Sequence, residues 1–139
     1  MNKHFWISSG TVGVASLMLG FVVHAQLLHA DYATLPNLFR SEAEAGRYFP
    51  FMLLAHFSIG LGLTWLYRRS LPVGRKFLGP GLSFGVAVAV AMTVPMYLFY
   101  YAVQPMPGAV VMKQIGFDVL GAVLLGVLTA LLNRPPKAS

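Results

Sequence analysis

The residues best suited to chemistry are a few polar side chains inside long apolar runs. They are His24, His56, Tyr97, Gln114 and Asp118. Imidazole and carboxylate groups bind protons or metals, and phenol and amide groups hydrogen-bond to either of them. Asp118 is the only acid placed well inside an apolar run. A carboxylate at the centre of a bilayer costs about 2.5–3.5 kcal/mol. We therefore expect Asp118 to have a partner, either His24 or His56 on another helix, or Lys113 or Gln114 on its own.

Two cofactor interpretations use the same side chains. His24 and His56, on different helices, are the minimum for bis-histidine ligation of haem b. Together with Asp118 they also make a two-histidine, one-carboxylate set of the kind that binds zinc or non-haem iron. Paired ligand spacings such as HxxxH are lacking within any one run. We therefore predict no cofactor, and haem b or a metal ion stays as the alternative occupant.

A further interpretation is a proton or solute pathway. Intramembrane Asp and His are the residues that proton relays use. However, these polar residues lie in the outer half of each run, and the inner half holds only Ser, Thr, Gly and apolar residues. This asymmetry argues against a complete proton path across the membrane. It favours either a polar pocket in one half of the bilayer or an interhelical hydrogen-bond cluster that fixes helix register. The chain lacks cysteine, a Gly-x-Ser-x-Gly motif and a phosphate loop, so we predict no catalytic residues and no enzyme.

Four apolar runs must position these side chains. A helix needs about 20 residues to cross the hydrocarbon core, and 57% of the chain is hydrophobic whereas 10% is charged. The runs predict helices at about 5–28, 49–67, 77–103 and 109–132, with an outer loop at 30–48. Connections this short favour neighbouring antiparallel helices. We predict a single transmembrane domain, 1–139, that is an all-α, up-down-up-down four-helix membrane bundle.

The basic residues indicate the orientation of the bundle. Seven of the ten Lys and Arg residues lie on the side that holds both ends of the chain: Lys3, Arg68, Arg69, Arg75, Lys76, Arg134 and Lys137. Cytoplasmic loops carry such an excess, so both termini are predicted to be cytoplasmic. Because the charges lie at the ends of apolar runs, the net charge of +6 does not indicate a nucleic-acid partner. The first run resembles a signal peptide, but its length favours a retained anchor.

Small residues identify the faces on which the helices pack. Helices in a bilayer associate by close approach at small side chains. The predicted packing positions are Gly13, Ser16, Gly20, Gly60, Gly81, Gly85 and Gly121, with Ala122 as an alternative to Gly121. Pro95 removes a backbone hydrogen bond and predicts a kink in the third run.

The outer loop has features of its own. Ser41 and Glu44 have the spacing of a capping box, so the second helix is predicted to begin near Ser41. Leu35, Leu38 and Phe39 indicate a short segment on the outer leaflet.

Three stretches carry a resemblance: His24–Tyr32, Tyr48–His56 and Tyr101–Gly108. Over nearly its whole length the chain resembles a family of small four-helix bacterial inner-membrane proteins with no known activity. The resemblance implies a multi-pass protein of the bacterial inner membrane and assigns no site residues.

These observations lead to a functional expectation and an alternative. We expect a non-enzymatic structural or accessory component of a larger membrane assembly. Its expected partners are the lipid bilayer and either a larger membrane protein complex or a second copy. The alternative is a small binding or transport protein whose pocket takes a proton, a metal, haem or a lipid-like ligand.

Overall fold

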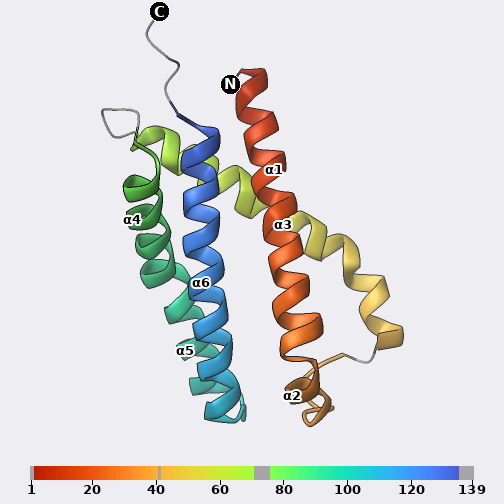
Figure 1. Ribbon diagram of the computed structural model, residues 1–139. Helices are drawn as coiled ribbons and strands as arrows, with labels where there is room; N and C mark the ends of the chain where they lie inside the picture. Colours follow the sequence, from red (N-terminus) through yellow and green to blue (C-terminus); the bar gives the residue numbers. More distant parts are fainter. Residues whose placement is uncertain (1, 41, 71–75, 135–139) are drawn as a thin grey trace, which may run out of the picture.

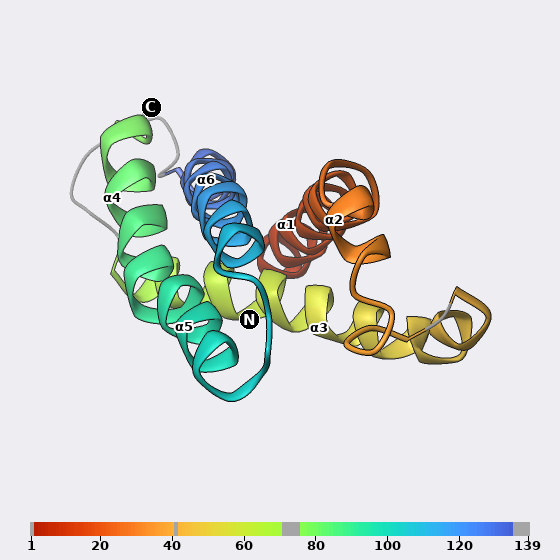
Figure 2. The same ribbon diagram turned by 90° about the horizontal axis from the view of Figure 1, so that it is seen from below.

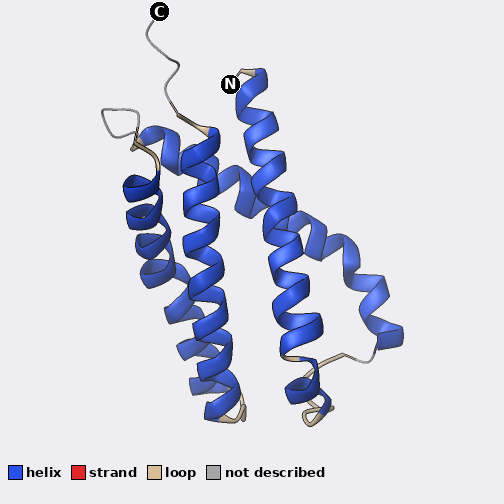
Figure 3. Ribbon diagram, viewed as in Figure 1, coloured by secondary structure: helices blue, strands red, loops and turns tan. Residues whose placement is uncertain are grey.

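The computed structural model describes residues 2–40, 42–70 and 76–134. These residues form helices and connecting loops, with no strand among them (Figure 3). The elements, in chain order, are α1 (Lys3–Gly20), η1 (Phe21–Leu27), α2 (His29–Ala33), α3 (Glu42–Arg69), α4 (Leu78–Val88), η2 (Ala89–Thr93), α5 (Val94–Val103) and α6 (Gly108–Leu132). The predicted all-α class is confirmed.

Four stretches of helix are long and apolar enough to cross a membrane: Lys3–Leu27, Ala43–Arg69, Leu78–Val103 and Gly108–Leu132. Three of them agree with the predicted runs to within two residues at each end. The second differs, because α3 begins at Glu42 and keeps Pro50 inside the helix. The predicted outer loop at 30–48 is therefore too long, since α2 and the start of α3 occupy much of it. The start at Glu42 confirms the prediction that this helix begins near Ser41, although the cap at Ser41 itself lies outside the described residues.

The helices associate as two pairs. α1 packs most extensively on α3, and α4 packs most extensively on α6, whereas contacts between α1 and α6 join the pairs. Figure 1 shows α3 crossing obliquely behind α1 and α6, and Figure 2 shows it lying across the other helices. The start of α1 and the end of α6 lie at one end of the molecule. α2 and the start of α6 lie at the other, which we call the α2 end.

Glycine allows close contact between α1 and α3. A Cβ at Gly60 would lie 2.2 Å from the backbone oxygen of Ser9 and 2.6 Å from the backbone nitrogen of Gly13. Gly20 faces the imidazole ring of His56, whose Cε1 would lie 3.1 Å from an added Cβ. The two backbones therefore touch where the helices cross, as small residues at a membrane helix interface permit.

The α4–α6 interface corrects one packing prediction. Gly81 and Gly85 face α6, where an added Cβ at Gly85 would lie 2.8 Å from the backbone oxygen of Ala122. Gly121 has nothing within 4 Å, and Gly126 contacts Gly85 instead. The prediction of Gly121 as a packing position is wrong, because steps of four from Asp118 along the helix reach Ala122 and Gly126.

Two π-helical segments interrupt the spans. η1 ends the first span and contains His24, and η2 directly precedes α5, in which Pro95 lies. The kink at Pro95 stays a prediction, and the structure has a π-helical turn directly before α5. Such turns widen the backbone and occur often at functional positions.

The connection between α2 and α3 packs back on the molecule. Leu35 and Leu38 lie against a buried cluster of Met106, Val110 and Val111 at the start of α6. Leu35 and Leu38 thus have an apolar surface within the chain, and the position of this segment on the outer leaflet stays a prediction. α2 and the residues after it therefore cover the start of α6.

Candidate functional site

Asp118 is the centre of a hydrogen-bond network near the α2 end. The Tyr97 hydroxyl, on α5, donates to Asp118 Oδ2, on α6. His24 Nε2, on η1, lies 3.3 Å from the same oxygen. Because an ionised carboxylate only accepts hydrogen bonds, both neighbours must donate to it. One carboxylate oxygen thus joins three membrane-spanning stretches.

The network continues from His24 to α2. The Tyr32 hydroxyl lies 2.7 Å from His24 Nδ1, and Gln114 Nε2 donates to the Tyr32 oxygen over 3.0 Å. His24, Tyr32, Tyr97, Gln114 and Asp118 are called the His24–Asp118 network below. His24 comes from a π-helical turn, Tyr32 from the helix after it, and Gln114 and Asp118 from positions four apart on α6. Residues four apart share one face of a helix, which explains why both face the same neighbours.

An ion pair between α2 and α6 lies beside the network. Lys113 Nζ lies 2.8 Å and 3.0 Å from the two carboxylate oxygens of Asp31. Lys113, considered above as a partner for Asp118, pairs instead with an acid on α2. This ion pair and the hydrogen bond between Tyr32 and Gln114 hold α2 against the first turns of α6.

The network is partly accessible. The side chains of His24 and Asp118 are 38% and 24% exposed, whereas Gln114 is buried. Gln114 Oε1 has no hydrogen-bond partner among the described residues. Burial raises the pKa of Tyr32 above its ordinary value of 10.0, and the charges of Asp118 and Asp31 add to this, while the hydrogen bond from Gln114 opposes it. Tyr32 is therefore held in its neutral, hydrogen-bonding form.

His56 belongs to a different contact. Its Nδ1 is hydrogen-bonded to Ser16 Oγ at 2.8 Å, and its ring packs on Gly20. Its inclusion in the predicted polar cluster is corrected, because α3 crosses α1 at this level and directs His56 onto α1. Both ring nitrogens of His24 are engaged by Tyr32 and Asp118. The described part of the chain holds no group of three His or acidic residues suited to a metal. Haem b ligation by His24 and His56 stays a prediction from the sequence.

Tyr32 is the member that sequence reasoning missed. Tyr32 lies just beyond the first apolar run, a position typical of an aromatic belt at the membrane interface. One feature of the sequence could have indicated its role: Tyr32 lies eight residues after His24, on a polar segment that also contains Asp31. The bend at Leu28, after which Tyr32 lies against His24, has no Gly or Pro to mark it in the sequence.

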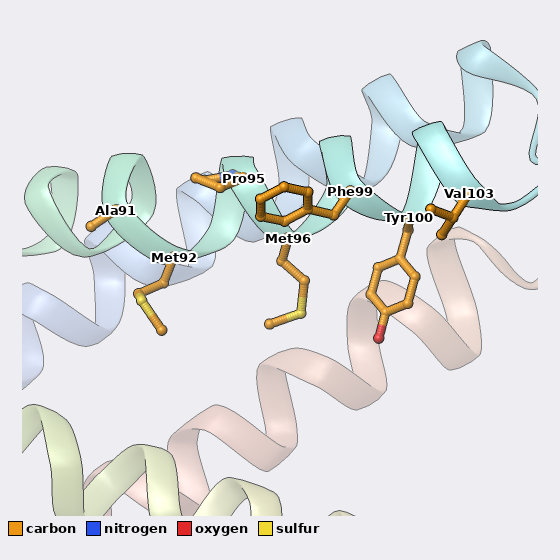
Figure 4. Close-up of a pocket in the computed structure, with 7 residues that line it drawn as sticks. All are labelled: Ala91, Met92, Pro95, Met96, Phe99, Tyr100 and Val103. Atoms are coloured by element: carbon orange, nitrogen blue, oxygen red, sulfur yellow. The ribbon is translucent and has the colours of Figure 1, made fainter.

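An apolar groove lies beside the network on α5. It has a volume of about 430 Å³ and is lined by Ala91, Met92, Pro95, Met96, Phe99, Tyr100 and Val103. Figure 4 shows Met92, Met96 and Tyr100 projecting from one side of the helix toward the neighbouring helices. Tyr100 is three residues from Tyr97, so the polar end of the groove adjoins the network.

The fold and the site define a class: a helical chain with four candidate membrane-spanning stretches, three of them joined by one polar network. Comparisons with protein-family models, with curated proteins and with solved structures find no match to this chain. Function must therefore be argued from the site and the surfaces.

Proposed function

We propose that this chain is a non-enzymatic accessory component of a larger membrane assembly in the bacterial inner membrane. The observation that carries the proposal is the surface of α3. Residues 43–55 are all exposed, and they include Tyr48, Phe49, Phe51, Met52, Leu53 and Leu54. The first half of this spanning helix thus has apolar side chains around it and little packing within the chain. A helix of a partner protein would cover it.

The polar groups support a structural role for the network. Tyr97, His24 and Tyr32 direct their polar atoms at each other, at Asp118 or at Gln114. These bonds join η1, α2, α5 and α6 through residues of the chain itself. α3 takes no part in them, so the network fixes three spans and leaves α3 as the surface for a partner.

The proposal includes an up-down-up-down bundle with both termini cytoplasmic. Its support is the basic end opposite the α2 end. Arg134 lies 3.6 Å from the ring centre of Phe77, and Arg69 lies 4.9 Å from that of Trp65. Arg side chains above aromatic rings suit the level of the lipid headgroups, and an excess of them is typical of the cytoplasmic side.

Purification in a mild detergent followed by native mass spectrometry tests this role. The wild-type protein is expected to bring down one larger membrane polypeptide at a fixed ratio. The double variant Phe51→Ala/Leu54→Ala, on α3, is expected to lose that polypeptide. The matched control is Leu120→Ala/Leu124→Ala, which changes two exposed apolar residues of α6. A homogeneous wild-type monomer, or equal loss in both variants, contradicts the proposal.

The groove on α5 favours a second candidate function, the binding of an amphipathic lipid-like molecule. Met92 and Met96 would contact an apolar chain, and the hydroxyl of Tyr100 would meet a polar head. Native mass spectrometry of the purified protein is expected to show a retained lipid of one class that Met96→Trp displaces. Retention of a lipid mixture that is unchanged in Met96→Trp argues against it.

A further inference from the structure

The directions of the hydrogen bonds in the His24–Asp118 network follow from what each group can donate. Asp118 only accepts, so neutral His24 carries its hydrogen on Nε2, the nitrogen 3.3 Å from the carboxylate. Its Nδ1 is then an acceptor, and the Tyr32 hydroxyl donates to it over 2.7 Å. With that hydrogen used, the Tyr32 oxygen accepts from Gln114 Nε2. The bonds therefore run from Gln114 to Tyr32, to His24 and to Asp118.

In this arrangement one buried acceptor, the side-chain oxygen of Gln114, has no hydrogen-bond donor among the described residues. Gln114 is 4% exposed, and its Oε1 has no partner among the described residues. The nitrogen of the same amide, Nε2, donates a hydrogen bond to the Tyr32 oxygen. A rotation of the amide by half a turn would place Oε1 where Nε2 now lies.

We infer that His24 is a proton-binding site whose occupation reverses the hydrogen bond between Tyr32 and Gln114. The added proton resides on Nδ1, so Nδ1–H donates to the Tyr32 oxygen. The Tyr32 hydroxyl hydrogen then turns to Gln114, and the amide rotates to accept it with Oε1. The bonds now run from His24 both to Asp118 and to Tyr32, and from Tyr32 to Gln114. No covalent bond breaks, and the single added proton accounts for the change in charge.

The surroundings of His24 suit a change of charge there. Asp118 on α6 supplies a negative charge, and Tyr97 on α5 and Tyr32 on α2 are neutral donors. The charges of Lys113 on α6 and Asp31 on α2 neutralise each other in an ion pair. His56 on α3 interacts electrostatically with His24. The His24 side chain is 38% exposed and lies near the α2 end of the first candidate span. Histidine ordinarily changes charge between pH 5 and 8.

Nuclear magnetic resonance of the full chain in nanodiscs, with ¹⁵N-labelled His and Gln, tests the inference. In the neutral state His24 is expected to carry hydrogen on Nε2 and none on Nδ1. On acidification Nδ1 gains a hydrogen, and the side-chain amide signal of Gln114 shifts at the same pH. Gln26 and Gln104 in the same sample are references that do not follow His24. Hydrogen on Nδ1 in the neutral state, or a Gln114 signal that ignores His24, overturns the inference.

The variant Tyr32→Phe tests whether the signal passes through the hydroxyl. His24 is expected still to bind a proton, whereas the response of Gln114 is lost. Tyr101→Phe, which removes an exposed hydroxyl, is the matched control and keeps the response. A Gln114 response that survives in Tyr32→Phe contradicts the inference. If Tyr32→Phe fails to fold, the wild-type titration decides alone, and neither experiment needs the partner of the proposed function.

Discussion

His24 Nε2 lies 3.3 Å from Asp118 Oδ2, and this contact joins the π-helical end of the first span to the fourth. Tyr97 donates to the same oxygen from the third span. An unpaired carboxylate inside the bilayer is costly, so two donors from other helices offset that cost. The position of Asp118 therefore determines how three helices meet.

Replacement of Asp118 by Ala is expected to lower the free energy of unfolding by about 1–3 kcal/mol, because His24 and Tyr97 lose their common acceptor. Unfolding of the detergent-solubilised protein measures this. Asp31→Ala is the control. Its partner Lys113 is 53% exposed, whereas His24, the partner of Asp118, is 38% exposed, and exposed pairs contribute about 1 kcal/mol or less. A smaller effect at position 118 than at position 31 would refute the central place given to Asp118.

Replacement of Gly60 by Ala is expected to force α1 and α3 apart. The added Cβ would lie 2.2 Å from the Ser9 backbone oxygen, and overpacking of this kind costs about 1–3 kcal/mol. Gly62, two residues away on the same helix, has nothing within 4 Å of an added Cβ. Gly62→Ala should leave stability unchanged or raise it slightly. Equal unfolding curves for the two variants would show that α1 and α3 do not touch here.

The raised pKa of Tyr32 predicts a loss of stability at high pH. Burial favours the neutral phenol in the fold, so its contribution is fully present below the ordinary value of 10.0 and is lost as the pH rises through the folded-state value. We expect wild type to exceed Tyr32→Phe in stability at pH 8 and the difference to shrink above about pH 10. A difference that is constant from pH 8 to pH 11 contradicts this account.

Single cysteines test the proposed orientation without background, because the chain has none. A cysteine at Thr34, exposed after α2, is expected to react with a membrane-impermeant maleimide in spheroplasts that retain an intact inner membrane. A cysteine at Ser70, exposed after α3 at the basic end, should react only after lysis. The opposite pattern reverses the orientation, and equal labelling of both argues against membrane insertion.

The sequence predicts the spans well because length and hydropathy alone decide them. Asp118, His24, Gln114 and Tyr97 could be grouped in advance, since intramembrane polar groups must find partners at similar depth. His56 was grouped with them wrongly, because depth does not reveal the direction in which α3 crosses α1. Tyr32 was missed because the backbone bends at Leu28 without Gly or Pro to mark the bend. Small size alone left Gly121 and Ala122 as alternatives, and the helical register from Asp118 favours Ala122.

Photocrosslinking from α3 in living cells tests the central claim of a partner most directly. A photoreactive residue replaces Phe51, which is 66% exposed, or Leu120 of α6, which is 57% exposed. The account predicts one discrete protein adduct from position 51, of the same mass as the polypeptide that copurifies, and lipid adducts from position 120. Lipid adducts alone from both positions would contradict it, because the first half of α3 would then face the bilayer like any other exposed surface.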